Sequence, residues 1–179
     1  FYKMKIDGLN YEIFLNDIAD HANHKENLLE LIEKMPDNSH DNVTKTDWKA
    51  NCGRPYFNYF KEHILQAPYS KLTKYLHADN YKIKNGWFQQ YEKGDSHNWH
   101  THTSCNYTNV YFVELPDKDF GTELWDSYKK KVRELDLKEG SLLTFPANVL
   151  HRSKTNTSKR KTIISFNSDF YFKDNLCIG

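Results

Sequence analysis

Two histidines one residue apart, followed by a third much later in the chain, have the types and spacing best suited to chemistry. His100 and His102 stand at positions i and i+2 in β-like sequence, so both side chains would lie on one face of a strand. His151 follows a buried-looking run at residues 141–145 and can meet them across a small barrel. Three imidazoles on one face can hold a divalent transition metal and leave coordination positions open.

The second half of the chain predicts the strands that must carry these histidines. Short aromatic or β-branched stretches, separated by Gly, Pro, Asn and Asp, occupy residues 81–91, 108–115, 123–125, 132–137, 141–145 and 161–172. Many short strands with turn signals between them are typical of a jelly roll or barrel. We therefore expect residues 81–179 to form a β core of this kind.

The first 80 residues indicate a mixed, mostly helical segment. Apolar positions from Leu28 to Ile32 have helical spacing, and Pro36 stops that helix. We expect a short strand at 2–9, a helix within 16–34, a polar loop at 37–46, a helix at 55–66 that is broken by Ala67-Pro68, and another helix at 70–77. Residues 1–80 should pack on the outside of the barrel, so that the whole chain is one compact domain.

Composition excludes several classes of function. The 179 residues carry a net charge of +1, which does not suit a nucleic-acid binder, and the lysines at 129–131 and 154–161 are interpreted as solvated loops. The three cysteines form neither a CxxC pair nor a disulfide framework, so we expect a reducing, cytoplasmic location. No apolar run is long enough to span a membrane, and residues 1–15 show no signal-peptide pattern. The oligomeric state is left open.

An ordered set of spacings resembles the iron(II)- and 2-oxoglutarate-dependent dioxygenases, in particular their prolyl-hydroxylase-like branch. That family carries a Tyr, a Gly three residues later and the first iron-binding His six residues after the Gly, as do Tyr91, Gly94 and His100. Its prolyl-hydroxylase branch places a Lys ten residues after the distal His, as in His151 and Lys161. The resemblance covers about residues 85–170, and residues 140–167 also resemble an uncharacterised group of bacterial and phage oxygenases.

The resemblance implies a fold, a reaction and a set of roles. The fold would be mainly β with α, a double-stranded β-helix (jelly roll, cupin-like) with N-terminal helices outside. The reaction would use Fe(II), O2 and 2-oxoglutarate to hydroxylate a C–H bond of a small-molecule or peptidyl substrate. Iron would be held by His100, His102 and His151, and 2-oxoglutarate by Lys161, Ser165, Tyr111 and Tyr91.

One position departs from the family pattern. The family has Asp or Glu two residues after the first His, and this chain has His102. Three imidazoles leave the full dipositive charge of the metal, which dianionic 2-oxoglutarate would balance, but they also suit zinc, nickel or copper. We favour a three-His variant. The open alternatives are that His102 swings away while Glu123 or Asp95 supplies a carboxylate, or that the site has lost iron chemistry.

Two other functions compete with the oxygenase. A cupin-like metalloprotein would use the three histidines without 2-oxoglutarate, although the Glu that the first cupin motif expects is absent and Asn106 or Tyr107 stands there. A non-catalytic jelly-roll binding module would hold zinc structurally. Metal-dependent activity that ignores 2-oxoglutarate would favour the cupin, and tight stoichiometric zinc without turnover would favour the binding module.

Other histidines and tryptophans have simpler interpretations. His97 lies three residues before His100 and could support the metal ligands or face the substrate. Trp48 lies in a loop-like stretch and either closes over the site or anchors the surface. We expect ordinary structural or solvated roles for His21, His24, His40, His63 and His77, and core packing rather than pocket lining for Trp87, Trp99 and Trp125.

Overall fold

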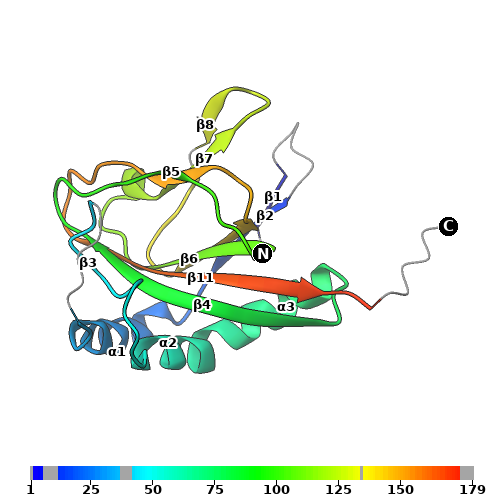
Figure 1. Ribbon diagram of the computed structural model, residues 1–179, viewed down its shortest axis with the longest axis horizontal. Helices are drawn as coiled ribbons and strands as arrows, with labels where there is room; N and C mark the ends of the chain where they lie inside the picture. Colours follow the sequence, from blue (N-terminus) through cyan, green and yellow to red (C-terminus); the bar gives the residue numbers. More distant parts are fainter. Residues whose placement is uncertain (1, 6–11, 37–41, 134, 174–179) are drawn as a thin grey trace.

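Two antiparallel sheets face each other in the computed structural model, which describes residues 2–5, 12–36, 42–133 and 135–173 (Figure 1). The larger sheet has seven strands in the order β1-β2-β9-β6-β11-β4-β3, and the smaller has four in the order β5-β10-β7-β8. Every strand pair is antiparallel. The expected jelly roll is therefore confirmed.

The strands fall mostly where the sequence predicts them. Their bounds are β1 Tyr2–Lys5, β2 Glu12–Asp17, β3 Lys45–Thr46, β4 Asn80–Tyr91, β5 His97–His100, β6 Tyr107–Glu114, β7 Thr122–Asp126, β8 Lys131–Arg133, β9 Ser141–Pro146, β10 His151–Ser153 and β11 Lys161–Tyr171. The sequence reasoning missed β2, which pairs with β9, and β3, which pairs with β4. These pairings join the first 80 residues to the later strands within one sheet.

The main helices cover the outer face of the larger sheet, as expected (Figure 1). They are α1 His21–Glu33, α2 Pro55–Phe60, the π-helical turn η1 Lys61–Leu65 and α3 Gln66–Tyr75; a short 3-10 turn, η2, spans Lys118–Phe120. No helix within the described ranges is long and apolar enough to cross a membrane. Cys52 and Cys105 are free thiols, while Cys177 and His40 lie outside the described residues.

The expected helix break at Ala67-Pro68 is wrong. Pro68 lies inside α3, directly after the π-helical turn η1. A proline in a regular α-helix removes one hydrogen bond and its ring clashes with the carbonyl four residues earlier. The wider hydrogen-bond register of a π-helical turn rearranges the carbonyls just before the proline, so the helix can continue past it.

The interior strand β11, which lies between β6 and β4, separates two hydrophobic cores by simple alternation. Ile164 and Phe166 pack in the core between the larger sheet and the helices, and Ile163 packs in the core between the two sheets. Because successive strand residues point to opposite faces, Lys161 and Ser165 share the inner face with Ile163. The inner face of β11 therefore places polar groups inside the jelly roll.

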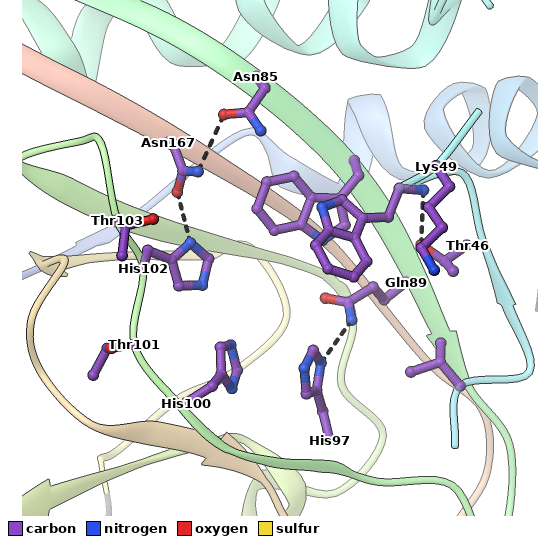
Figure 2. Close-up of a pocket in the computed structure, with 13 residues that line it drawn as sticks. Thr46, Lys49, Asn85, Gln89, His97, His100, Thr101, His102, Thr103 and Asn167 are labelled. Atoms are coloured by element: carbon purple, nitrogen blue, oxygen red, sulfur yellow. Dashed lines mark hydrogen bonds between the residues drawn. The ribbon is translucent and has the colours of Figure 1, made fainter. Parts of the chain in front are cut away.

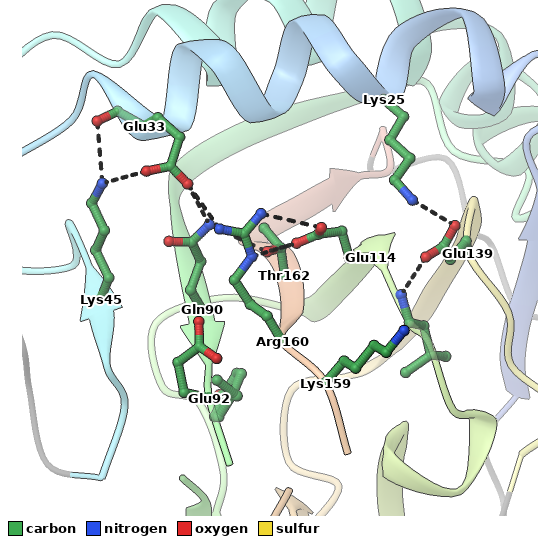
Figure 3. A network of polar contacts seen from close by, with 12 residues as sticks. Lys25, Glu33, Lys45, Gln90, Glu92, Glu114, Glu139, Lys159, Arg160 and Thr162 are labelled. Atoms are coloured by element: carbon green, nitrogen blue, oxygen red, sulfur yellow. Dashed lines mark hydrogen bonds and ion pairs between the residues drawn. The ribbon is translucent and has the colours of Figure 1, made fainter.

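A polar network fastens α1 to the edge of the sheet where β11 begins (Figure 3). Arg160 donates from Nε to a Glu114 oxygen at 2.9 Å and from Nη1 to a Glu33 oxygen of α1 at 3.0 Å. Lys45 of β3 lies 3.4 Å from the other Glu33 oxygen. Arg160 directly precedes β11, so this network positions the first residue of that strand, Lys161.

Gly86 is required where α2 meets β4. A Cβ at this position would lie 2.2 to 2.7 Å from ring atoms of Phe57 in α2, closer than van der Waals contact permits. We predict that Gly86→Ala lowers the free energy of unfolding by about 1–3 kcal/mol, because overpacking forces neighbouring groups apart. Chemical denaturation monitored by circular dichroism measures the change.

The matched control is Gly53→Ala, since a Cβ there meets nothing within 4 Å. This variant should change the free energy of unfolding by no more than about 0.5 kcal/mol. Equal stability of the Gly86→Ala protein and the unmodified protein would contradict the packing described here.

Candidate metal centre

Pairing of β5 with β10 brings two of the three histidines together. His100, the last residue of β5, lies directly opposite His151, the first residue of β10. Residues opposite each other in an antiparallel pair project to the same side. His102 lies two residues beyond β5, and its backbone N–H donates to the Ala147 carbonyl at 2.9 Å. One ring nitrogen from each of the three histidines lies within 4.8 Å of the other two.

The outer ring nitrogens of two histidines are held by backbone oxygens. His100 Nδ1 lies 2.7 Å from the Asn98 carbonyl oxygen, and His151 Nδ1 lies 2.9 Å from the Val149 carbonyl oxygen. A carbonyl oxygen only accepts, so each Nδ1 carries the proton. Each Nε2 therefore keeps a lone pair, which is the form that binds a metal.

The third histidine is oriented by a side chain. His102 Nδ1 donates to the Asn167 Oδ1 atom at 2.8 Å, and Asn167 Nδ2 donates to Asn85 Oδ1 at 3.1 Å (Figure 2). Asn167 is 9% exposed and lies on β11. His102 thus has the same tautomer as the other two histidines, and its Nε2 is also free to ligate.

Burial keeps the three imidazoles neutral. Removal from water lowers the pKa of His100 and of His102. The pKa of His151, which is 4% exposed, falls to about 3 through burial and then through the neighbouring His100. Neutral imidazoles with converging lone pairs fit a divalent first-row metal such as iron(II), nickel or zinc.

The carboxylates that could have replaced His102 are engaged elsewhere. Glu123 accepts from Arg152 Nε at 2.6 Å and lies 3.7 Å from the Lys154 ammonium. Asp95 accepts backbone N–H groups of a nearby turn and of Thr44, the latter at 2.9 Å. His102 points into the cluster with its ring centroid 5.1 Å from that of His151. The structure therefore favours the three-His arrangement over the alternative in which His102 swings away.

Aromatic rings pack against each of the three histidines. Trp87 stacks on His102 with centroids 5.8 Å apart and planes 16° apart, and Phe145 meets His151 edge-on at 4.8 Å. His97 stacks on His100 at 4.2 Å, and its Nδ1 lies 3.0 Å from Gln89 Nε2 (Figure 2). His97 thus lies beside the candidate ligands, as the sequence suggested. Trp87 also lines the adjoining cavity, contrary to the expectation of core packing alone.

Lys161 is buried beside Ser153 and Tyr91, two residues in the wall of a small inner cavity. It is 1% exposed, its Nζ donates to the Phe120 carbonyl at 2.8 Å and to Ser153 Oγ, and it lies 4.3 Å from the Tyr91 ring centroid. Burial lowers the pKa of Lys161 to about 7, which the carboxylate of Glu123 partly opposes. A buried ammonium that lacks a carboxylate hydrogen-bond partner is a strong potential anion anchor.

The inner cavity extends from the histidines to the residues that contact Lys161. Its volume is about 30 Å³, and its walls include all three histidines, Tyr91, Ser153, Ser165 and Thr122. Ser165 is 4% exposed, and its hydroxyl donates to Gln89 at 3.3 Å. Sequence reasoning missed Ser153, although its place two residues after His151 on β10 puts both side chains on one face.

Tyr111 is not brought to this site. Its hydroxyl lies 2.7 Å from His21 Nδ1, and its ring packs in the core between the larger sheet and the helices. Val110 and Phe112, its neighbours on β6, belong to the core between the sheets, so Tyr111 points the other way. We therefore leave Tyr111 out of the candidate site. His21 and His24, which contacts Tyr59 at 2.8 Å, also lie on the helical side.

A wider cavity opens outward from the histidines. Its volume is about 480 Å³, within the usual range for small-molecule sites. Trp48 and Trp87 form part of its wall, with ring centroids 6.3 Å apart, and Trp48 is 47% exposed at the surface. Trp99 instead pairs with Trp125 at 6.1 Å. The open side of the three-His cluster therefore faces a cavity large enough for a substrate.

Comparison with known proteins finds similarity in structure alone. No protein-family model matches the sequence, and no curated protein sequence matches it significantly. The viral collagen prolyl hydroxylase vCPH from Paramecium Bursaria Chlorella virus-1, solved as its 2-oxoglutarate complex, superposes with a TM-score of 0.63 and 15% identity over 93% of this chain and 98% of that one.

Two further solved structures share the fold. HygX from Streptomyces hygroscopicus, with nickel, 2-oxoglutarate and hygromycin B bound, gives a TM-score of 0.64 and 10% identity over 87% of this chain and 82% of its own. A prolyl hydroxylase from Trichoplax adhaerens, in complex with a hypoxia-inducible-factor peptide fragment, gives a TM-score of 0.59 and 16% identity over 89% of this chain and 83% of its own. The chain thus has the double-stranded β-helix seen in solved 2-oxoglutarate–iron(II) oxygenases, including prolyl hydroxylases.

The contact between Asn167 and His102 generates a test of metal binding. We predict that Asn167→Ala weakens binding of Ni(II) by about tenfold to a hundredfold, because His102 loses the acceptor that fixes its tautomer and ring orientation. Asn167→Asp keeps an acceptor and should retain binding. Isothermal titration calorimetry of the metal-free protein with Ni(II) measures the affinities.

Asn98→Ala is the matched control for this test. Asn98 supplies its backbone carbonyl rather than its side chain to His100, so removing the side chain should leave Ni(II) affinity unchanged. Equal affinity in the Asn167→Ala and Asn98→Ala proteins would show that Asn167 does not position a ligand.

The buried ammonium of Lys161 predicts a pH dependence of stability. The pKa of Lys161 is about 7 in the folded protein and 10.5 for an ordinary lysine, so the unfolded chain binds more protons between these values. The contribution of Lys161 to the free energy of unfolding should therefore rise by about 1.4 kcal/mol per pH unit from pH 7 toward 10.5. Denaturant titrations of the ligand-free protein and of Lys161→Met, compared at several pH values, measure this difference. If the difference in free energy of unfolding between the two proteins does not vary with pH, the prediction is wrong.

Proposed function

We propose that this chain is an iron(II)- and 2-oxoglutarate-dependent oxygenase that hydroxylates a C–H bond. The observation that carries the proposal is the combination of two features around one small cavity. Three neutral imidazoles bring one ring nitrogen each to within 4.8 Å of one another, and the buried ammonium of Lys161 contacts Ser153 and Tyr91, which line that cavity together with the histidines. The shared fold with solved oxygenases supports the same conclusion.

Each group has a role in this proposal. His100, His102 and His151 hold iron(II), while Lys161 pairs with the far carboxylate of 2-oxoglutarate. Ser153 and Ser165 offer hydroxyls to the same carboxylate, and both line the inner cavity. When bound, the iron and 2-oxoglutarate supply the oxidising chemistry with O2, and 2-oxoglutarate is converted to succinate and carbon dioxide. The protein orients these groups and excludes water from them.

Binding of 2-oxoglutarate requires the inner cavity and the contacts of Lys161 beside it to rearrange. An inner volume of about 30 Å³ has room for about two water molecules, and the Lys161 ammonium is turned toward Ser153 and the Phe120 carbonyl. Lys161 must therefore exchange its contact with Ser153 for one with the entering carboxylate. A charged acceptor is a better partner for an ammonium than a neutral hydroxyl, which favours the exchange.

The competing interpretations explain fewer of these features. A cupin-like site without 2-oxoglutarate, or a structural zinc module, would use the three histidines equally well, since imidazoles also suit zinc. Neither gives a role to a fully buried lysine whose ammonium has no carboxylate hydrogen-bond partner among the described residues. The oxygenase accounts for both the histidines and the lysine.

Substrate and location belong to the proposal as well. The solved relatives include one with a peptide fragment and one with hygromycin B, and the outer cavity here is open enough for a peptidyl side chain or a small molecule. An intracellular, cytoplasmic location is proposed from the free thiols of Cys52 and Cys105.

Anaerobic addition of iron(II) and 2-oxoglutarate tests the proposal directly. We expect the weak visible absorption of their chelate, and slow formation of succinate once air is admitted. His151→Ala should abolish both signals. Lys161→Ala should weaken 2-oxoglutarate binding by about tenfold to a hundredfold, since a hydrogen bond to a charged group is lost.

Lys159→Ala is the matched control, because Lys159 is an exposed lysine two positions away on the same segment. It should leave both signals unchanged. If the visible band is absent in the natural protein but appears in His102→Asp, the proposal is contradicted. The natural histidine would then prevent formation of the iron–2-oxoglutarate chelate.

A further inference from the structure

The outer cavity has an uneven distribution of charge. Among the described residues that line it, Lys49 is the one with a permanent charge, and none carries a carboxylate. Lys49 is exposed and forms no ion pair with any residue in the described ranges. Among the described residues, the mouth of the cavity therefore carries a positive charge, which Lys49 can offer to a ligand.

Nearby acidic groups do not cancel this charge. Asp47, next to Trp48, is fully buried and accepts from Arg54 Nε at 2.7 Å, so that pair is neutral as a whole. Asp95 accepts backbone N–H groups outside the cavity wall, and Glu123 pairs with Arg152. The charge of Lys49 is thus left uncompensated by the described part of the chain.

The walls of the cavity combine an apolar surface with amide groups. Val43, Trp48 and Trp87 supply apolar area, and the two indole rings lie at an angle of 41° to each other. Asn85 and Gln89 add amide groups from the inner face of β4 (Figure 2). A flat or cyclic apolar body can lie against such rings, while amides and an ammonium suit an oxygen-rich group.

The segment that carries Trp48 and Lys49 is held in place rather than loose. The Asp47 carboxylate accepts from Tyr56 Oη at 2.8 Å, from Arg54, and from the backbone N–H of Phe88 at 3.0 Å. These bonds tie the segment to α2 and to β4. Asp47 is therefore a positioning residue that fixes two side chains of the cavity wall beside the histidines.

The three-His centre removes a repulsion that a carboxylate ligand would create. This step rests on the proposed function: a dipositive metal and dianionic 2-oxoglutarate together carry no net charge when all three protein ligands are neutral. A carboxylate in place of His102 would make the centre more negative by one charge. In this chain an anion can therefore approach the centre at a lower electrostatic cost.

We propose that the substrate of this site is a small organic carboxylate with a flat or cyclic apolar body. The body lies against Trp48 and Trp87, and its carboxylate pairs with Lys49 at the mouth of the cavity. The cavity volume of about 480 Å³ suits a molecule of this size. The charge of Lys49 sets the polarity of the ligand, and the indole rings set its shape.

Three probes of similar shape and different charge test the proposal. Benzoate, benzamide and benzylammonium are titrated into the protein loaded with Ni(II) and 2-oxoglutarate, and into the metal-free protein, with ligand-observed NMR as the readout. We expect benzoate to bind about fivefold more tightly than benzamide, the size of an exposed ion pair, and benzylammonium most weakly. The preference should shrink as salt is added.

Variants assign the preference to particular side chains. Lys49→Gln should remove the preference for benzoate and Lys49→Glu should reverse it toward benzylammonium. Trp48→Ala should weaken the binding of all three probes to the same extent. Lys71→Gln is the matched control, because it removes the same charge from α3, on the opposite side of the larger sheet. It should leave the affinities for all three probes unchanged.

The outcomes separate the two proposals. Equal binding of the three probes, no measurable binding of any of them, or a benzoate preference that survives Lys49→Gln would each overturn the carboxylate site. A protein that takes up neither metal nor 2-oxoglutarate would contradict the proposed function. The metal-free titration would still decide the carboxylate site in that case, because Lys49, Trp48 and Trp87 do not depend on the metal.

Discussion

Convergence of three hydrogen-bond-oriented imidazoles is the constraint on which this structure depends. Each Nδ1 donates to an oxygen atom, so each Nε2 presents a lone pair to the same small volume. Lone pairs that face one another in a partly desolvated site repel, and a cation is their natural complement. The pairing of His100 with His151 across β5 and β10 creates the arrangement, and Asn167 on β11 completes it through His102.

Strand β11 couples this centre to the rest of the fold. One face carries Lys161, Ser165 and Asn167 into the jelly roll, while the other carries Ile164 and Phe166 into the core beneath the helices. Because a one-residue slip would exchange the two faces, the hydrophobic packing of the helices also fixes the register of the polar groups. The helical layer therefore positions the site without touching it.

His102 stands where the oxygenases that the sequence resembles have a carboxylate, and this affects the electrostatics of the whole cavity. If the three neutral imidazoles hold a metal as proposed, they leave its charge uncompensated, so anionic ligands would balance it. The buried ammonium of Lys161 and the exposed one of Lys49 extend the same positive character inward and outward. The histidine at position 102, where the resembled oxygenases have a carboxylate, and the charge of the cavity are thus consistent with one another.

Local signals in the sequence determined most strands from residue 81 onward and the spacings that join His100, His151 and Lys161. Only the tertiary structure decided which face of β6 is inner, and so where Tyr111 points. Residues 108–113 are buried on both faces, which removes the alternation that would reveal direction. The helix through Pro68 and the contacts of Ser153 and Asn167 likewise depend on partners distant in the chain, which local spacing does not encode.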